Sequence, residues 1–98
     1  MTDAVPTLQV VGDRWEVSGA MTMDSAAQLL NASKALATPQ AGVVDLGHVQ
    51  RLDSAGVSLL LAWKRRAAAE GKTLRFTHVP PSMTSLAQLY GVEEMLTA

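Results

Sequence analysis

The hydrophobic and polar positions at the start of the chain predict a β-hairpin. The runs TLQVV and RWEVSG are short and rich in β-branched or aromatic residues, which favours strands at 7–11 and 14–18. Gly12 and Asp13 stand between the two runs and have the composition of a two-residue turn.

A helix is expected next, because apolar residues then recur at intervals of three and four. Thr22 can cap its start, and the helix should end near Thr38 and Pro39. A strand follows at GVVDL, an uninterrupted apolar run between two glycines that is typical of a strand covered on both faces. The apolar positions of the expected helix are Met23, Ala26, Leu29, Leu30 and Leu36.

The remaining pattern predicts a connection, GHVQRLD, and then the longest helix of the chain. Residues 55–70 are rich in Leu, Ala, Lys and Arg and stop at Gly71, which suits a left-handed helix end. KTLRFTHV alternates apolar and polar positions and predicts a further strand, and PPSM starts a third helix over 82–90 that closes at Gly91. The segment VEEML is expected to add one helical turn on the core.

This order of elements predicts an α/β fold, a mixed β-sheet of about four strands with three to four helices packed on it. A chain of 98 residues has room for one core, so we expect a single domain over 1–98 with residues 1–6 loose. Hydrophobic residues make up 48% and charged residues 17%, which argues against disorder and leaves apolar surface for a partner.

Charge and cysteine content exclude several classes of function. A net charge of −1 supplies no broad field for nucleic acid or an anionic membrane, so we predict neither as a partner. The absence of cysteine excludes disulfides, thiolate zinc sites and a cysteine nucleophile, and suits a reducing compartment. No export signal and no run of about 18 apolar residues is present, so we predict a cytoplasmic protein that does not insert into a membrane.

The sequence DSAG at the start of the long helix is the main candidate for chemistry, and its serine, Ser54, invites a catalytic interpretation. A nucleophile elbow requires glycine two residues before the serine, and Leu52 occupies that position. His48 and His78 have no spacing that argues for a triad, and two lone histidines make a weak metal site. We therefore predict no catalysis, no metal and no cofactor.

Two interpretations of Ser54 stay open. As a helix cap, its hydroxyl would accept a hydrogen bond from a free backbone N–H, which stabilises a helix by about 1 kcal/mol. As a switch, it would carry a phosphate near the positive end of the helix dipole, although beside the negative Asp53. Gly56 is expected to keep the first turn bare and accessible for such a switch.

The long helix also predicts an exposed apolar patch. Successive helical residues turn by about 100°, so Leu59 and Leu61 lie about 200° apart and cannot both face one sheet. Leu59, Leu60, Leu61 and Trp63 therefore cannot all be buried, and we expect some of them to form an apolar patch near the helix start. Arg65 and Arg66 would lie on its rim, and which of the apolar side chains faces outward stays open.

The segment VVDLGHVQRLDSAGVSLLLAWKRRAAAEGKTLRFTHV resembles the STAS domain, which is found in anti-sigma factor antagonists and related modules. The resemblance extends over nearly the whole chain, and its most specific element is the apolar strand ending in D-L followed by D-S-A-G. It implies a mixed sheet with helices on one side, no catalysis, and Ser54 at the phosphorylatable position of a partner-binding face. The residues that we assign to this face are Asp53, Ser54, Ala55, Gly56, Val57 and Trp63.

Two branches of that family compete. The short length and the ending SLAQLYGVEEML resemble the MlaB branch, the small cytoplasmic STAS subunit of Mla phospholipid-transport ABC complexes. This implies a subunit that binds the transporter's ATPase subunit, and through it the permease, at the inner membrane, in intermembrane phospholipid transport that maintains outer-membrane lipid asymmetry. Serine at position 54, where threonine is often expected in that branch, favours the alternative of an anti-sigma factor antagonist phosphorylated at Ser54 by an anti-sigma kinase.

Overall fold

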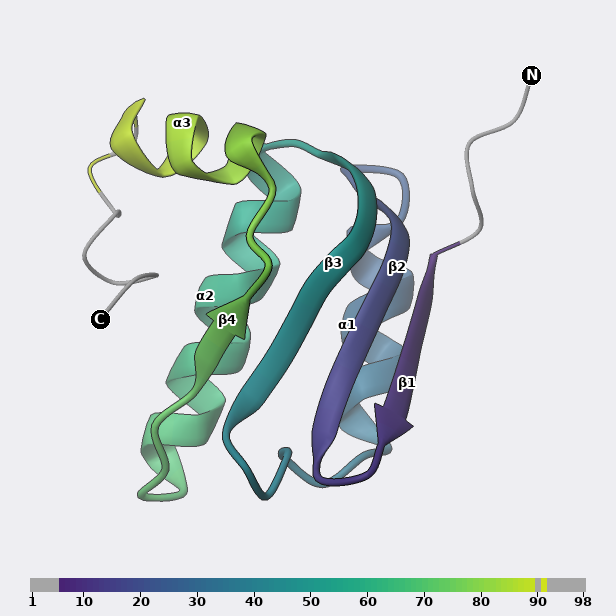
Figure 1. Ribbon diagram of the computed structural model, residues 1–98, viewed down its shortest axis with the longest axis vertical. Helices are drawn as coiled ribbons and strands as arrows, with labels where there is room; N and C mark the ends of the chain where they lie inside the picture. The colour runs from purple at the N-terminus through teal and green to yellow at the C-terminus, as the bar shows by residue number, and fades with distance from the viewer. Residues whose placement is uncertain (1–5, 90, 92–98) are drawn as a thin grey trace.

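The strands form one four-stranded sheet in the order β1-β2-β3-β4 (Figure 1). The structure is a computed structural model that describes residues 6–89 and 91. Its elements are β1 (Thr7–Val11), β2 (Arg14–Met21), α1 (Ala26–Lys34), β3 (Val43–Leu52), α2 (Ser54–Ala69), β4 (Arg75–Thr77) and α3 (Pro81–Leu89).

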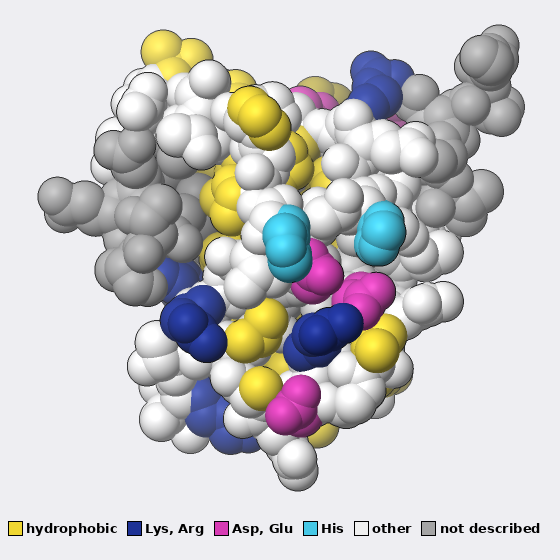
Figure 2. Space-filling view, viewed as in Figure 1, with side chains coloured by type: hydrophobic (Ala, Val, Ile, Leu, Met, Phe, Trp, Pro, Cys, Tyr) yellow, Lys and Arg dark blue, Asp and Glu magenta, His cyan; other side chains and the backbone are white. Residues whose placement is uncertain are grey.

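The sheet is mixed, and its two long helices cover one face. β1 and β2 form the expected antiparallel hairpin, and Gly12 in its turn has a φ of +61°. β2, β3 and β4 run parallel and are joined through α1 and α2, which lie behind the sheet, whereas the opposite face is open and shows both histidines (Figures 1 and 2). The predicted α/β fold is therefore confirmed, while the extent of the domain over 1–98 stays a prediction.

The third strand is longer than the sequence pattern indicates. The predictions that the strand ends at GVVDL and that GHVQRLD is a connection are both wrong, because β3 continues to Leu52. Its pairing with β2 shifts twice, and at each shift β3 carries one extra residue. These bulges let the strand continue past Gly47, so that β3 leads almost directly into α2.

The first helix starts later and ends earlier than predicted. The prediction that Thr22 caps this helix is wrong, because α1 begins at Ala26 and ends at Lys34. The hydroxyl of Ser25 donates to the carbonyl of Ala20 at 2.7 Å and accepts from the N–H of Thr22 at 2.9 Å. These bonds close a turn between β2 and α1, and the turn takes up the residues that the apolar pattern assigns to the helix.

The second and third helices agree with the sequence pattern within a residue. α2 ends before Gly71, whose φ of +73° confirms the left-handed helix end. β4 is shorter than KTLRFTHV suggests, and both the expected helical turn at VEEML and residues 1–5 lie outside the described residues. None of the helices among the described residues combines the length and the apolar character of a membrane-spanning segment.

Two tryptophans form the centre of the core between α2 and the sheet. Trp15 of β2 and Trp63 of α2 meet edge to face, with ring centroids 5.4 Å apart and an interplanar angle of 79°. The indole N–H of Trp63 donates to the hydroxyl of Ser33 in α1 at 2.9 Å. Trp63, which the sequence assigns to the partner-binding face, is therefore a core residue, and only 2% of its surface is accessible.

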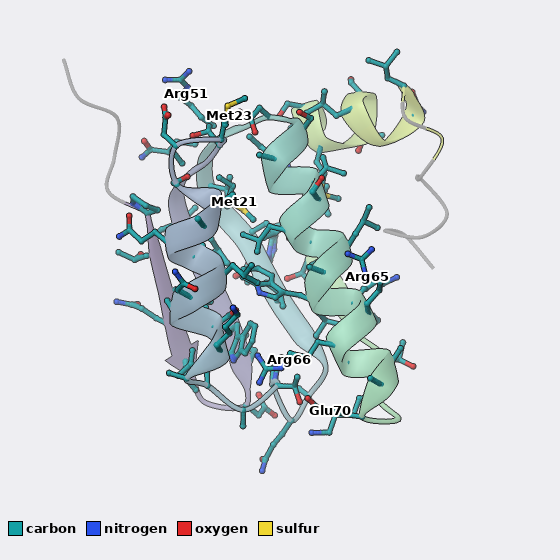
Figure 3. The ribbon with its side chains drawn as sticks, turned by 180° about the vertical axis from the view of Figure 1, so that it is seen from behind. Met21, Met23, Arg51, Arg65, Arg66 and Glu70 are labelled. Atoms are coloured by element: carbon teal, nitrogen blue, oxygen red, sulfur yellow. The ribbon has the colours of Figure 1, made fainter. Side chains whose placement is uncertain are left out.

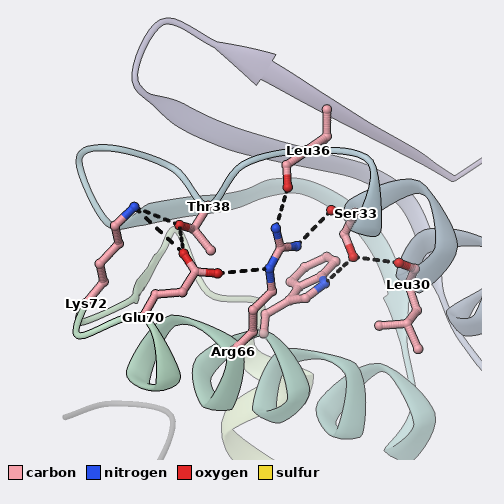
Figure 4. Close-up of polar contacts among 8 residues, drawn as sticks. Leu30, Ser33, Leu36, Thr38, Arg66, Glu70 and Lys72 are labelled. Carbon is pink, nitrogen blue, oxygen red and sulfur yellow. Dashed lines mark hydrogen bonds and ion pairs between the residues drawn. The ribbon is translucent and has the colours of Figure 1, made fainter.

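Arg66 ties the end of α1 to α2 and does not line an exposed patch as predicted. Its guanidinium donates to the carbonyl of Ser33 at 2.8 Å and to that of Leu36 (Figure 4). It also lies 5.8 Å from the ring centroid of Trp15. Seen from behind, α1 and α2 cover the sheet side by side, with Arg66 turned inward between them and Arg65 turned outward (Figure 3). One carbonyl in the last turn of α1 and one just after the helix thus accept hydrogen bonds from a cation on the neighbouring helix.

Candidate functional site

Asp53 organises the start of α2. Its backbone is extended, and its Oδ1 accepts hydrogen bonds from the N–H groups of Ala55 at 2.9 Å and Gly56 at 3.3 Å. Its other oxygen, Oδ2, accepts from the N–H of Met23 at 2.9 Å. Asp53 is therefore the helix cap, and it also joins α2 to the turn before α1. The interpretation of Ser54 as the cap is wrong.

Ser54 is the first residue of α2, and its side chain is exposed. Because Asp53 already bonds to the free N–H groups of the first turn, the serine hydroxyl is not needed there. Ala55 beside it is half-buried. The structure thus gives Ser54 the exposed hydroxyl that both a partner contact and a phosphorylation site require.

Gly56 and Val57 lie beneath this surface. A Cβ added to Gly56 would lie 2.3 Å from the carbonyl oxygen of Met21, so glycine is what lets α2 approach the end of β2. Val57 is 2% exposed and belongs to the core. The expectation that Gly56 keeps the first turn accessible is wrong. Gly56, Val57 and Trp63 are all buried beneath the surface to which the sequence assigns them.

Met23 is a surface residue that the sequence pattern misassigns. The pattern places it on the buried stripe of a helix, yet 78% of its surface is exposed (Figure 3). It lies in the turn that Asp53 holds against the start of α2. Ser25, a residue type common in turns and caps, is the signal from which a later helix start could have been predicted.

An apolar groove of about 340 Å³ runs between α1 and α2, next to Ser54. None of the described residues that line it is charged, and Leu59, which is 4% exposed, forms part of its floor. An apolar patch was predicted near the start of this helix, and the structure has the groove there instead. The small residues at spacings of three and four along α2 are the signal from which the groove could have been predicted. It is lined by Ala26, Ala27, Leu30, Ala55, Ser58, Leu59 and Ala62.

A polar hollow of about 390 Å³ lies on the other side of Asp53. It is formed where β2 and β3 end and α3 begins, and Asp24 and Arg51 give it charges of both signs. We call the apolar groove, Met23, Ser54 and this hollow together the α2 face. An apolar centre with a polar rim is the usual anatomy of a protein-binding surface.

The histidines lie on the open face of the sheet, away from this arrangement. They share a hollow of about 520 Å³ that Ser54 does not line. Nδ1 of His78 lies 3.0 Å from Oδ1 of Asp45, and the N–H of Gly47 donates to the same oxygen at 2.9 Å. Burial by itself would raise the pKa of Asp45, but these two donors hold the pKa below its ordinary value.

The site therefore has the parts of a binding surface. Ser54 does not line the hollow that contains His48 and His78, so the described residues do not place either histidine as a base for the serine. Within residues 6–89 and 91, no group of three or more His, Cys, Asp and Glu is arranged to hold a metal ion.

Comparisons with known proteins agree on one kind of domain. The protein-family model described as "Mlab, STAS domain" matches residues 4–97. Among solved structures, 19 chains match, and one is the anti-sigma factor antagonist SpoIIAA in its unphosphorylated form. That match has a TM-score of 0.65 at 17% sequence identity and covers 95% of this chain and 86% of SpoIIAA. No curated protein matches the sequence.

Proposed function

Because this chain belongs to the STAS domain family, we propose that it is a non-catalytic binding subunit that docks on the ATPase of an Mla-type ABC transporter. The family model that covers residues 4–97 carries the Mlab description, which supports this branch. In this role the protein supports the ATPase, and through it the permease, in intermembrane phospholipid transport that maintains outer-membrane lipid asymmetry. It would lie in the cytoplasm, held at the inner membrane by its complex.

The observation that carries this proposal is the uncharged groove beside two exposed side chains, Met23 and Ser54. Small residues line most of the groove, so an apolar side chain or a helix of the ATPase can approach both helices closely. Met23 is flexible and exposed, and a thioether of this kind adapts well to an apolar partner surface. Asp24 and Arg51 at the rim would set the orientation of the partner.

A binding experiment tests this surface. Ser54→Arg and Met23→Asp should each weaken the complex with the ATPase by at least about tenfold, because each places a charge where apolar surface is to be buried. The measurement is copurification followed by titration of purified subunits. Thr73→Arg is the matched control, since Thr73 is exposed in the loop after α2, at the other end of that helix.

The control variant should bind as the wild type does. If Ser54→Arg and Met23→Asp remain folded and copurify with the ATPase at wild-type levels, the α2 face is not the docking site. If the wild-type protein itself does not bind the ATPase, the transporter role is wrong.

Two observations favour a second candidate, an anti-sigma factor antagonist switched by phosphorylation. The Ser54 hydroxyl is exposed, and the fold is similar to that of SpoIIAA. A phosphate on Ser54 would add about two negative charges beside Asp53 and the groove, which would repel a partner that had buried this surface.

Incubation with ATP and a candidate anti-sigma kinase, followed by intact-mass measurement, tests this second candidate. One phosphate is expected on the wild-type protein and none on Ser54→Ala. Phosphate on both proteins, or on neither when the kinase is active on its known substrate, would contradict a switch at Ser54.

A further inference from the structure

The outer edge of β1 carries exposed apolar side chains that no part of the α2 face uses. Among the described residues, the exposed large hydrophobic side chains include Val10, at 55%, and Val11, at 39%, both on this strand. The strand TLQVV has no charged residue, and β1 is at the end of the strand order. Edge strands are normally protected against pairing by charges, prolines or bulges, and this strand contains none of these.

The hairpin determines which backbone groups face outward. In a hairpin with a two-residue turn, the residues that flank the turn form a hydrogen-bonded pair, and here these are Val11 and Arg14. Because the pairing alternates, the backbone groups of Val11, Gln9 and Thr7 point toward β2. Those of Val10 and Leu8 point away from the sheet and are available to another strand.

The outward-facing backbone groups are arranged symmetrically about Gln9. We propose that β1 pairs antiparallel with β1 of a second copy of this chain, centred on Gln9, so that two four-stranded sheets form one continuous sheet. Leu8 of each copy exchanges two backbone hydrogen bonds with Val10 of the other copy. Pro6 occupies the next outward-facing position and has no N–H to donate, so it ends the ladder and disfavours a slipped register.

The side chains fit the same register. Leu8 and Val10 stand opposite Val17 and Trp15 of β2, which are buried, so both project toward the helix side of the sheet. In the dimer Val10 of one copy packs on Leu8 of the other copy, and Val11 packs on Thr7 across the open side. No like charges meet along the contact, which favours a second copy as the occupant.

The dimer leaves the α2 face free, so this inference does not depend on the proposed function. A contact made by one five-residue strand buries less than a standard interface does, and dimerisation is therefore expected only at high protein concentration. The apparent mass should rise from 10.4 kDa toward twice that value as the concentration is raised.

A single cysteine tests the register directly, because the chain has no cysteine of its own. The two Gln9 residues form a non-hydrogen-bonded pair in the dimer, with Cα atoms about 4.5 Å apart, a separation that a disulfide can span. Under mild oxidation, Gln9→Cys should form a disulfide dimer at least about tenfold faster than Gln50→Cys. Gln50 is the matched control, an exposed glutamine on β3.

Val10→Lys tests the same edge without a cross-link. Since Val10 is more than half exposed, the lysine should leave the fold intact, confirmed by circular dichroism, and should abolish the concentration-dependent rise in mass. Equal cross-linking of Gln9→Cys and Gln50→Cys, or a wild-type protein that stays monomeric, overturns the proposal. Backbone amide shifts of Leu8 and Val10 that change only when the ATPase is added would assign this edge to the ATPase.

Discussion

At the scale of single residues, Asp53 and Gly56 show how the start of α2 is built. Asp53 accepts three backbone hydrogen bonds, two within α2 and one from Met23 in the turn before α1. Gly56 leaves the space that the carbonyl oxygen of Met21 occupies. The exposed Ser54 therefore rests on a rigid base, which suits a residue that contacts a partner.

Gly56→Ala tests the steric role of the glycine. In an exposed helix interior this change stabilises by about 1 kcal/mol, but here the added Cβ would lie 2.3 Å from a backbone oxygen. We expect the free energy of unfolding to fall by about 1–3 kcal/mol, measured by chemical denaturation. Ser58→Ala, an exposed position on the same helix, should change it little. A stabilised Gly56→Ala variant would show that α2 does not pack this closely on β2.

The sequence pattern leaves open which of two neighbouring residues caps α2. Asp53 and Ser54 are both good capping residues, and the order D-S allows either to cap the helix. The backbone decides between them, because Asp53 is extended and Ser54 is already helical. That choice determines which of the two side chains is left for a partner.

At the scale of elements, α2 is fixed at both ends by side chains that reach other elements. Asp53 holds its first turn, and at its last turn Arg66 and Glu70 contact the end of α1 and the loop that follows (Figure 4). The hydroxyl of Thr38 donates to Glu70 at 2.7 Å, and Arg66 lies 3.4 Å from the same carboxylate. The α2 face is thus presented by a helix that cannot easily rotate on the sheet.

This network makes stability depend on pH through Glu70. The hydrogen bond from the hydroxyl of Thr38 is the main reason that the pKa of Glu70 lies below its ordinary value. Burial opposes this as the next largest effect, and Arg66 and Lys72 add to the lowering. A carboxyl with a lowered folded pKa stabilises the protein above the unfolded pKa, about 4.3, and this contribution disappears as pH falls through the folded pKa.

Glu70→Gln should therefore be less stable than the wild type at neutral pH. The difference in the free energy of unfolding should shrink as pH is lowered below about 4.3, because both proteins are then uncharged at this position. Urea denaturation across this range measures the effect. A difference that stays constant with pH would mean that the carboxylate charge contributes nothing to the network.

At the scale of the whole molecule, the two proposed surfaces lie on different elements. The α2 face gathers the start of α2, the groove beside α1 and the loops at the ends of β2 and β3, whereas the dimer contact uses β1 at the edge of the sheet (Figure 1). The sheet order places β2 between β1 and β3. One copy could therefore bind the ATPase and a second copy at the same time.

The two surfaces are expected to respond independently to substitution. Val10→Lys should bind the ATPase with wild-type affinity, and Ser54→Arg should retain wild-type dimerisation, because the two sites share no residue. Titration with the ATPase and sedimentation of the isolated protein measure the two effects. Loss of both activities in either single variant, with the fold intact, would mean that the surfaces are coupled.

The features that depend on near neighbours in the chain could be predicted from the residues alone. The Gly-Asp turn, the length and left-handed end of α2, and the order of elements all follow from turn chemistry, helix ends and hydrophobic spacing. These signals act over a few residues along the chain. The resemblance carried by D-S-A-G after the apolar strand agreed with the family that the comparisons show.

Which side chains reach the surface depends on contacts between elements that are far apart in the chain. Trp63 is buried by Trp15 and bonds to Ser33, 30 residues away in the sequence. Met23 is exposed because the hydrogen bond from Ser25 to Ala20 holds a turn at this place, so Met23 lies before the helix and not on its buried face. Periodicity divides a helix into faces, but contacts between distant elements determine which face meets the sheet, and these contacts leave no local pattern.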